Sequence, residues 1–336
     1  MKVDAGLSGR IDAAATEAAE AEASGFDGIW APELNHDPFL PLVAAAEASR
    51  AMQLGTSIVV AFARSPMITA QMSWDLQDFS GGRMMLGLGS QIRPHIEKRF
   101  SMPWSHPAPR MREYVLALRA IWDRWQNGVK LDFRGDFYQH TLMTPMFDPG
   151  PLPSGPPKVF LAAVGTGMTK VAGEVADGIL LHAFTTDRYI REVSLPAIDE
   201  GLAQGGRDRG SFEVKFSPFV ATGRTEEELA AETKATRERV GFYGSTPAYR
   251  PILDLHGWGD LQTQLNAMSK EGKWVEMGEL IDDEVLAAFA VVAPLDDLPA
   301  ALAERVSGIS DRTTLGLRDD VGADELSAAL KTVRAA

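Results

Sequence analysis

Residues 158–181 read KVFLAAVGTGMTKVAGEVADGILL, and this stretch indicates the fold of the chain. Lys158–Ala163 and Gly178–Leu181 are short aliphatic runs typical of buried strands, and a helical pattern over Met168–Ala176 separates them. Parallel strands need a crossover between them, and that crossover is usually a helix. The stretch therefore predicts a parallel βαβ unit and an α/β protein.

The same alternation of aliphatic runs and helical patterns extends along the rest of the chain. We predict strands at Val3–Leu7, Gly28–Ala31, Ser57–Ala61, Arg83–Gly87, Lys158–Ala163, Gly178–Leu181, Phe212–Ala221 and Thr313–Leu317, and a closing helix at Ala323–Arg334. Eight strands that alternate with helices predict a (β/α)₈ TIM barrel. Residues Val129–Met143 predict a β-hairpin. Residues 243–286 fit no repeat, and we expect a mainly helical insertion there, at the carboxyl-terminal face of one domain spanning residues 1–336.

The composition limits the classes of function. The 336 residues exceed the roughly 250 of a typical α/β barrel but lie within the range of barrels with insertions. A net charge of −13 argues against broad binding of nucleic acid or anionic membranes. The absence of cysteine excludes disulfides and cysteine nucleophiles, and the histidines lack metal-ligand spacing, so we expect no metal. No signal peptide or membrane span is visible, so we expect a cytoplasmic protein.

Candidate functional residues follow the predicted strands, because (β/α)₈ enzymes carry their active sites at the carboxyl ends of the strands. They are found in five segments: Glu33–His36, Phe62–Arg64, Gly87–Gln91, Val164–Gly167 and His182. Glycine at such a position lets backbone N–H groups approach a phosphate or a ring. The segment Gly165–Gly167 precedes a helix and can bind phosphate through free N–H groups. The same glycines can instead simply form tight turns.

Three polar side chains at these strand ends allow more than one interpretation. Glu33 can be a base, a partner for a ring nitrogen or a structural hydrogen-bond acceptor. His36 and His182 are the histidines at the mouth of the predicted barrel. His182 lies in an apolar run, so it can be a structural histidine, or it can protonate a carbonyl or bind a cofactor.

Several short segments at and between the predicted strand ends occur in the same order as in the luciferase-like family. The chain therefore resembles this family, specifically its branch that uses the deazaflavin coenzyme F420. The matching segments are Gly25–Trp30 with Glu33, Leu54–Ser57, Arg64–Pro66, Ser80–Arg83, Leu86–Ser90, Ala162-Ala163 and Ala176–Gly178. The likeness covers most of residues 1–222 and returns near residues 287–317. It implies a barrel of the bacterial luciferase-like type, with the cofactor ring against the third strand and a non-prolyl cis peptide bond between Ser57 and Ile58.

The resemblance also implies an activity and a set of site residues. The activity is hydride transfer between F420 and a small organic substrate, with His182, His36 and Glu33 as catalytic candidates. The expected cofactor contacts are Glu33, Ser57, Ile58, Gly89, Ser90, Gln91, Ala162, Ala163, Gly165, Thr166, Gly167 and His182. The sugar-phosphate dehydrogenases of the family have a histidine and a glutamate where this chain has Leu34 and Ile92, so their chemistry is not expected here.

Several alternatives remain open from the sequence. The same ring site can serve a monooxygenase that uses reduced FMN and oxygen, because both cofactors share a tricyclic ring and a ribityl phosphate. A hydrolase would need two carboxylates, for which Glu33 and Asp37 are the candidates. A non-catalytic binding protein on the same scaffold is the fourth possibility. The resemblance further implies a homodimer formed through the second and third helices. The net charge and the lack of a membrane span lead us to expect no nucleic-acid or membrane partner.

Overall fold

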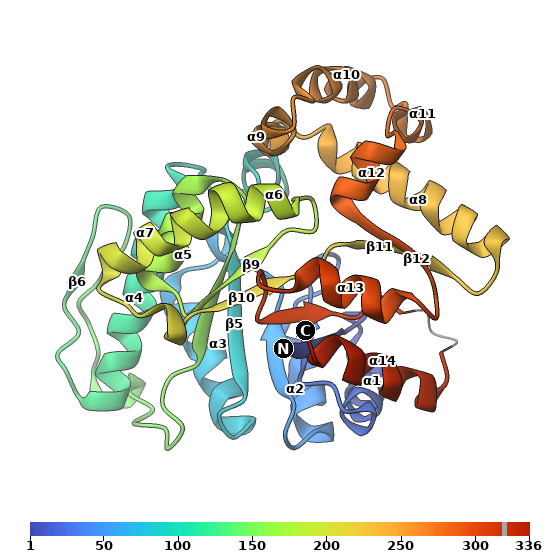
Figure 1. Cartoon of the computed structure of the whole chain (residues 1–336). Helices are drawn as coiled ribbons and strands as arrows, with labels where there is room; N and C mark the ends of the chain where they lie inside the picture. The colour runs from blue at the N-terminus through green and yellow to red at the C-terminus, as the bar shows by residue number, and fades with distance from the viewer. Residues whose placement is uncertain (318–320) are drawn as a thin grey trace.

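Eight parallel strand positions close into a barrel in the computed structural model, which describes residues 1–317 and 321–336 (Figure 1). Nine strands fill these eight positions, because β3 (Gln53–Thr56) and β4 (Val59–Val60) both pair with β5 and share the third position. The other barrel strands are β1 (Lys2–Gly6), β2 (Gly28–Ala31), β5 (Met84–Gly89), β8 (Lys158–Ala163), β9 (Gly178–Leu181), β10 (Glu213–Phe216) and β13 (Arg312–Thr314). They follow the order β3-β2-β1-β13-β10-β9-β8-β5-β4, and β3 also pairs with β5, which closes the ring. The predicted (β/α)₈ TIM barrel is therefore confirmed.

Helices surround this barrel on the outside (Figure 1). They are α1 (Ile11–Ser24), α2 (Phe39–Ala48), α3 (Pro66–Phe79), α4 (Pro107–Asn127), α5 (Thr166–Val175), α6 (Asp187–Tyr189), α7 (Leu195–Gly205), α13 (Leu298–Val306) and α14 (Ala323–Arg334).

The hairpin predicted within residues 129–143 forms from β6 (Phe133–Arg134) and β7 (Gln139–His140). The chain ends meet, since the amino group of Met1 donates to the carbonyl of Arg334 at 3.1 Å.

A group of helices lies together at one end of the molecule, beyond the barrel (Figure 1). The group contains α8 (Glu226–Gly244), α9 (Arg250–Leu255), α10 (Gly259–Lys270), α11 (Trp274–Glu279) and α12 (Asp283–Phe289). A one-turn 3₁₀ helix, Pro247–Tyr249, links α8 to α9. In the part of the chain that the structure describes, no helix is long and apolar enough to cross a membrane.

The third strand differs from its prediction. Its main segment is β3, Gln53–Thr56, which lies before the predicted Ser57–Ala61. The backbone then passes through a cis peptide bond between Ser57 and Ile58, as the resemblance implies, before the short β4. The prediction started too late because Gly55 resembled a turn residue. In the barrel, however, a Cβ at Gly55 would lie 2.2 Å from the Trp30 ring, so the glycine makes room for that ring.

The seventh predicted strand, Phe212–Ala221, consists of two strands. β10 belongs to the barrel, whereas β11 (Phe219–Gly223) leaves it and pairs in parallel with β12 (Ala290–Pro294). Pro218 separates them, and proline has no N–H to donate to a sheet. The eighth strand is also shifted, because β13 covers Arg312–Thr314, and the last three residues of the predicted Thr313–Leu317 lie beyond its end.

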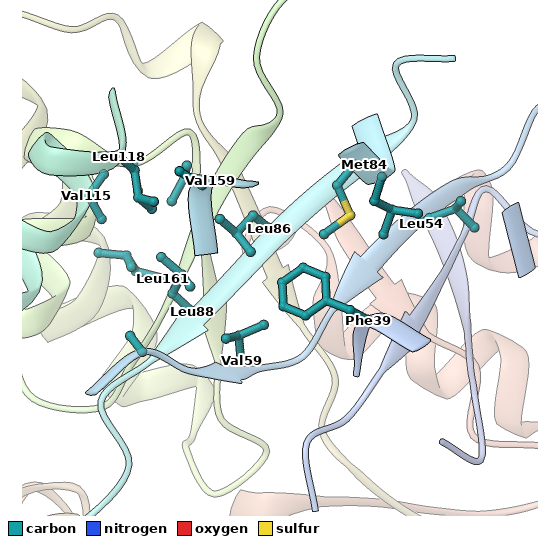
Figure 2. Packing of buried hydrophobic residues seen from close by; sticks show 14 of the residues in the cluster. Phe39, Leu54, Val59, Met84, Leu86, Leu88, Val115, Leu118, Val159 and Leu161 are labelled. Carbon is teal, nitrogen blue, oxygen red and sulfur yellow. The ribbon is translucent and has the colours of Figure 1, made fainter. Parts of the chain in front are cut away.

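The main hydrophobic core lies between the strands and the outer helices (Figure 2). Alternate strand residues such as Leu86, Leu88 and Leu161 point outward and pack near Val115 and Leu118 of α4. All five side chains are fully buried. This alternation leaves the other residues of each strand facing the barrel interior, which decides what lines the mouth.

The interior of the barrel changes in character from one end to the other. Near the amino-terminal end, Asp4 accepts hydrogen bonds from Trp30 Nε1 at 2.7 Å and from Arg312 Nη2 at 2.6 Å. The next level is apolar and is formed by Trp30, Met85, Phe160 and Leu180. A closed polar network and an apolar plug therefore fill the barrel beneath its carboxyl-terminal mouth.

Candidate active site

Small residues occupy the inward-facing positions at the carboxyl ends of the strands. Counting by two from the interior residues Met85 and Phe160 places Gly89 and Ala162 on the same face of their strands. A Cβ at Gly89 would lie 2.7 Å from Ile58 Cδ1 and 3.6 Å from the Cβ of Ala162. Ile58 and Ala162 therefore border the space beside Gly89, and we call Ile58, Gly89 and Ala162 the mouth floor. A larger residue at position 89 would displace Ile58.

Two further glycines at strand ends leave room for a bound group. A Cβ at Gly6, which ends β1, would meet no atom within 4 Å, and the same holds at Gly165 after β8. Gly165 is the N-cap residue of α5, and no side chain accepts a hydrogen bond from the first N–H groups of this helix. Thr166 and Gly167 are exposed in its first turn. The backbone N–H groups of such a turn have no partner within the helix, and they favour an anion such as a phosphate.

The structure shows Glu33 as the centre of an ionic cluster. Its carboxylate accepts from the backbone N–H of Val60 at 2.7 Å and from Arg64 Nη1 at 2.7 and 2.9 Å. Arg64 Nη2 also donates to Asp37 at 2.8 Å. Burial opposes the charge on Arg64, but the two carboxylates raise its pKa above the ordinary value, so the guanidinium stays charged. Among the open interpretations of Glu33, this geometry favours a structural acceptor that holds β4 in place.

The same cluster gives no support to the hydrolase alternative. A hydrolase needs one carboxyl group that is free to give a proton and another that is free to accept one or to attack. Glu33 and Asp37 instead hold the same guanidinium, Arg64. Neither carboxylate is therefore free for that chemistry in this arrangement.

His182 follows β9, two residues after the inward-facing Leu180, and is partly buried. The backbone N–H of Phe184 donates to its Nδ1 at 2.9 Å. Nδ1 must therefore be unprotonated, and the proton of the neutral ring lies on Nε2. Burial lowers the pKa of His182 to about 4. At neutral pH the ring is thus an uncharged hydrogen-bond donor through Nε2, which makes it a poor proton donor but a good partner for an oxygen atom.

Two tyrosines that the sequence reasoning missed pack on His182. The ring centroid of Tyr243, in the last turn of α8, lies 4.7 Å from that of His182, and Tyr249 lies 5.1 Å away. Both belong to residues 243–286, which showed no repeat, so no strand-end rule pointed to them. Aromatic residues near a predicted mouth loop were the only available signal.

The remaining predicted residues have different surroundings. Ser57 and His36 are exposed, and no contact in the described part of the chain joins His36 to His182. The Ser90 hydroxyl donates to the carbonyl of Gln91, whose own side chain accepts from the Ile92 N–H at 3.2 Å. The side chains of Ser90 and Gln91 thus make hydrogen bonds within the loop that contains them. Ala163 faces outward into the main core, so only its backbone is available to the mouth.

Metal binding has no visible basis at this site. Within residues 1–317 and 321–336, no group of three or more His, Cys, Asp or Glu side chains is arranged to hold a metal ion. The chemistry available at the mouth is therefore that of a neutral imidazole, two phenols, exposed backbone N–H groups and a floor of small residues.

This barrel and its sequence define the class of protein. The chain belongs to the luciferase-like monooxygenase family, whose profile matches residues 2–312. It is thus a member of a family of oxidoreductases and monooxygenases. An uncharacterised protein of Mycobacterium tuberculosis is 57% identical over 93% of this chain and 92% of its own length.

More distant relatives have described activities. The 5,10-methylenetetrahydromethanopterin reductase of Archaeoglobus fulgidus is 27% identical over 86% of this chain and 83% of its own. Among solved structures, the coenzyme F420 dependent tetrahydromethanopterin reductase of Methanopyrus kandleri superposes with a TM-score of 0.76. It is 21% identical and covers 99% of this chain and 96% of its own, so this likeness concerns the fold.

Proposed function

We propose that this protein is an oxidoreductase that transfers a hydride between coenzyme F420 and a small organic substrate. The observation that carries the proposal is the mouth floor, where Ile58, Gly89 and Ala162 form an apolar surface, together with the donor Nε2–H of His182 at the end of the strand next to β8. A planar ring needs such a surface to approach the strand ends. The motifs shared with the F420 branch and the similarity to a reductase of Archaeoglobus fulgidus support the same assignment.

The residues present fit a deazaflavin in two ways. The mouth floor would support the ring, with Ser57 and the backbone of Ala163 at its edges. The exposed first turn of α5, at Thr166 and Gly167, would hold the phosphate through backbone N–H groups. When bound, the cofactor supplies or accepts the hydride.

His182 has a defined part in this proposal. Its Nε2–H would donate to the oxygen on the substrate carbon that gains or loses the hydride, where negative charge develops. The hydrogen bond from Phe184 to Nδ1 holds the ring in the required tautomer. Because the neutral imidazole does not give up this proton readily, His182 stabilises charge, and the proton itself comes from or returns to solvent.

The proposal is tested by titrating the purified protein with F420 and, in parallel, with FMN. We expect F420 to bind and its fluorescence to change, and we expect Gly89→Ala to raise the Kd for F420 by about tenfold. The physical reason is that overpacking costs about 1–3 kcal/mol when Ile58 is displaced into the mouth. Gly210→Ala is the matched control, because a Cβ there would be 3.6 Å from its nearest neighbour, and Gly210 lies just before β10, at the end of the strand opposite to the mouth.

Each other result of this titration has a clear meaning. If FMN binds more tightly than F420 and the reduced complex consumes oxygen rapidly, the flavin monooxygenase alternative replaces the proposal. If neither cofactor binds, the redox assignment is wrong. A Kd that Gly89→Ala leaves unchanged would contradict the role of the mouth floor.

We also propose that the protein forms a homodimer through α2 and α3. The support is apolar surface, because Leu40 and Val43 on α2 are 56% and 45% exposed, and Ile68 on α3 is 49% exposed. We expect light scattering to give the mass of a dimer and the double variant Leu40→Asp, Ile68→Asp to give that of a monomer. Leu142→Asp, at a 74% exposed loop residue, is the control that should remain dimeric. A monomeric wild-type protein would refute this interface.

A further inference from the structure

Three rings with unused hydrogen-bonding groups gather where β9 ends. We call His182, Tyr243 and Tyr249 the mouth aromatic cluster. Besides their contacts with His182, the two tyrosine rings approach each other, with centroids 6.2 Å apart. Across residues 1–317 and 321–336, neither tyrosine hydroxyl makes a hydrogen bond, and Nε2 of His182 makes none either. The cluster therefore carries three groups that can donate a hydrogen bond and have no protein partner in the described residues.

The cluster is held in position by further aromatic side chains behind it. Phe184 lies 5.1 Å from Tyr249 and stacks on Phe289 at 4.3 Å, measured between ring centroids. Phe219 lies 5.8 Å from Tyr243. Phe184 and Phe289 are fully buried and Phe219 is 8% exposed. This support restricts the rotation of the two tyrosines, so a ligand meets a wall that is already formed.

No ionised side chain contributes to the shifted pKa of His182 or of Tyr249. Burial alone lowers the pKa of His182, and the pKa of Tyr249 is raised by burial and then by Tyr243. The charged residue that follows Tyr249, Arg250, has its own partner in Asp254 at 3.4 Å. A charged group placed against the cluster would lose water and gain no counter-ion, which is unfavourable.

We propose that the mouth aromatic cluster binds an uncharged, planar, conjugated carbonyl or alcohol compound. The ring of this compound stacks against Tyr249, and its oxygen accepts the hydrogen bond from Nε2 of His182. The aromatic rings favour a ligand with a flat apolar surface, and the hydrogen-bond donors favour a ligand with an oxygen atom. Anions such as carboxylates and phosphates should bind poorly, because they would find no counter-ion at His182 and Tyr249. This inference deepens the proposed function and rests on it for the redox chemistry, but the binding step is measured without any cofactor.

The experiment compares three probes by saturation-transfer NMR on the full chain without cofactor. The probes are acetophenone, benzoate, which has the same ring and a negative charge, and cyclohexanone, which has the carbonyl without the flat ring. We expect acetophenone to bind at least about tenfold more tightly than benzoate and about three- to tenfold more tightly than cyclohexanone, in line with the energies of buried charge and of aromatic pairs.

Variants then assign the binding to the cluster. Tyr249→Leu should raise the Kd for acetophenone about three- to tenfold, whereas Tyr249→Phe keeps the ring and should change it less than twofold. Phe147→Leu is the matched control, because Phe147 is 61% exposed and its ring contacts none of the three rings of the cluster in the described residues. Thermal unfolding of each variant shows whether it is folded, and the order of the three probes on the wild-type protein tests the inference even if Tyr249→Leu does not fold.

The outcomes separate this inference from the proposed function. Equal or tighter binding of benzoate, or an unchanged Kd in folded Tyr249→Leu, overturns the inference even if F420 binds. If acetophenone binds through Tyr249 but neither F420 nor FMN binds, the cluster is a ligand site and the redox assignment fails.

Discussion

Replacing Asp4 with alanine is expected to lower the free energy of unfolding by about 3–5 kcal/mol, the cost of removing one partner from a buried ion pair. Asp4 and Arg312 are both fully buried, and Arg312 donates to Asp4 through Nε at 3.0 Å and Nη2 at 2.6 Å. Trp30 Nε1 donates to the same carboxylate at 2.7 Å, and Lys215 Nζ lies 3.7 Å from it. The substitution would leave two buried cations and an indole N–H short of an acceptor.

The loss should be accompanied by a change at Lys215. Burial lowers the pKa of Lys215, and Asp4 opposes that shift, so removal of Asp4 should lower the pKa further.

Urea denaturation of the Asp4→Ala variant measures its free energy of unfolding. Asp12→Ala is the matched control: Asp12 also pairs with an arginine, Arg10, but both are exposed, and solvent screens such a pair so that its loss changes stability little. A loss below about 1 kcal/mol in Asp4→Ala would show that the network does not depend on this carboxylate.

The second large effect is expected in catalysis. His182→Ala should lower kcat about 10²- to 10³-fold, the usual loss when one donor to a developing oxyanion is removed. His182→Asn should recover part of this loss, because its side-chain amide can also donate. His36→Ala should have little effect, since His36 is exposed and has no contact with His182 in the described residues. Turnover is followed at the deazaflavin absorbance band with a carbonyl compound that the wild-type enzyme reduces.

The pH dependence follows from the lowered pKa of His182. With a pKa of about 4, the ring is neutral over the whole range from about pH 5 to 8. We therefore expect kcat/KM to show no change in this range that is caused by protonation of His182. The unfolded chain has a histidine pKa near 6.5, so it takes up a proton first as the pH falls. The stability that His182 contributes is therefore present above about pH 6.5 and is lost as the pH falls toward 4.

Nitrogen NMR of His182 measures both the pKa and the tautomer directly. We expect a proton on Nε2 and an unprotonated Nδ1, because Phe184 donates to Nδ1. A kinetic limb near pH 6.5 that disappears in His182→Ala would show that His182 titrates as an acid, contrary to the role proposed here.

Local patterns of apolar and polar residues were sufficient to predict the bounds of several strands and helices. β2, β8, β9 and α14 have the predicted bounds, because each is a continuous apolar or amphipathic run bounded within two residues by a glycine, a proline or a polar residue. The positions of Glu33 and His182 at strand ends were equally visible, because the (β/α)₈ architecture itself brings such residues to one face.

Other features depend on contacts between residues that are distant in the chain, which no local pattern encodes. β3 was missed because Gly55 is required by the ring of Trp30 on the neighbouring strand. Glu33 became a structural acceptor through Arg64, and His182 became a neutral donor through Phe184 and the tyrosines of another element. Residue types and their periodicity are properties of the chain alone and predicted the barrel and its mouth. The charge state and partners of each mouth residue arise only when burial and neighbours act on it.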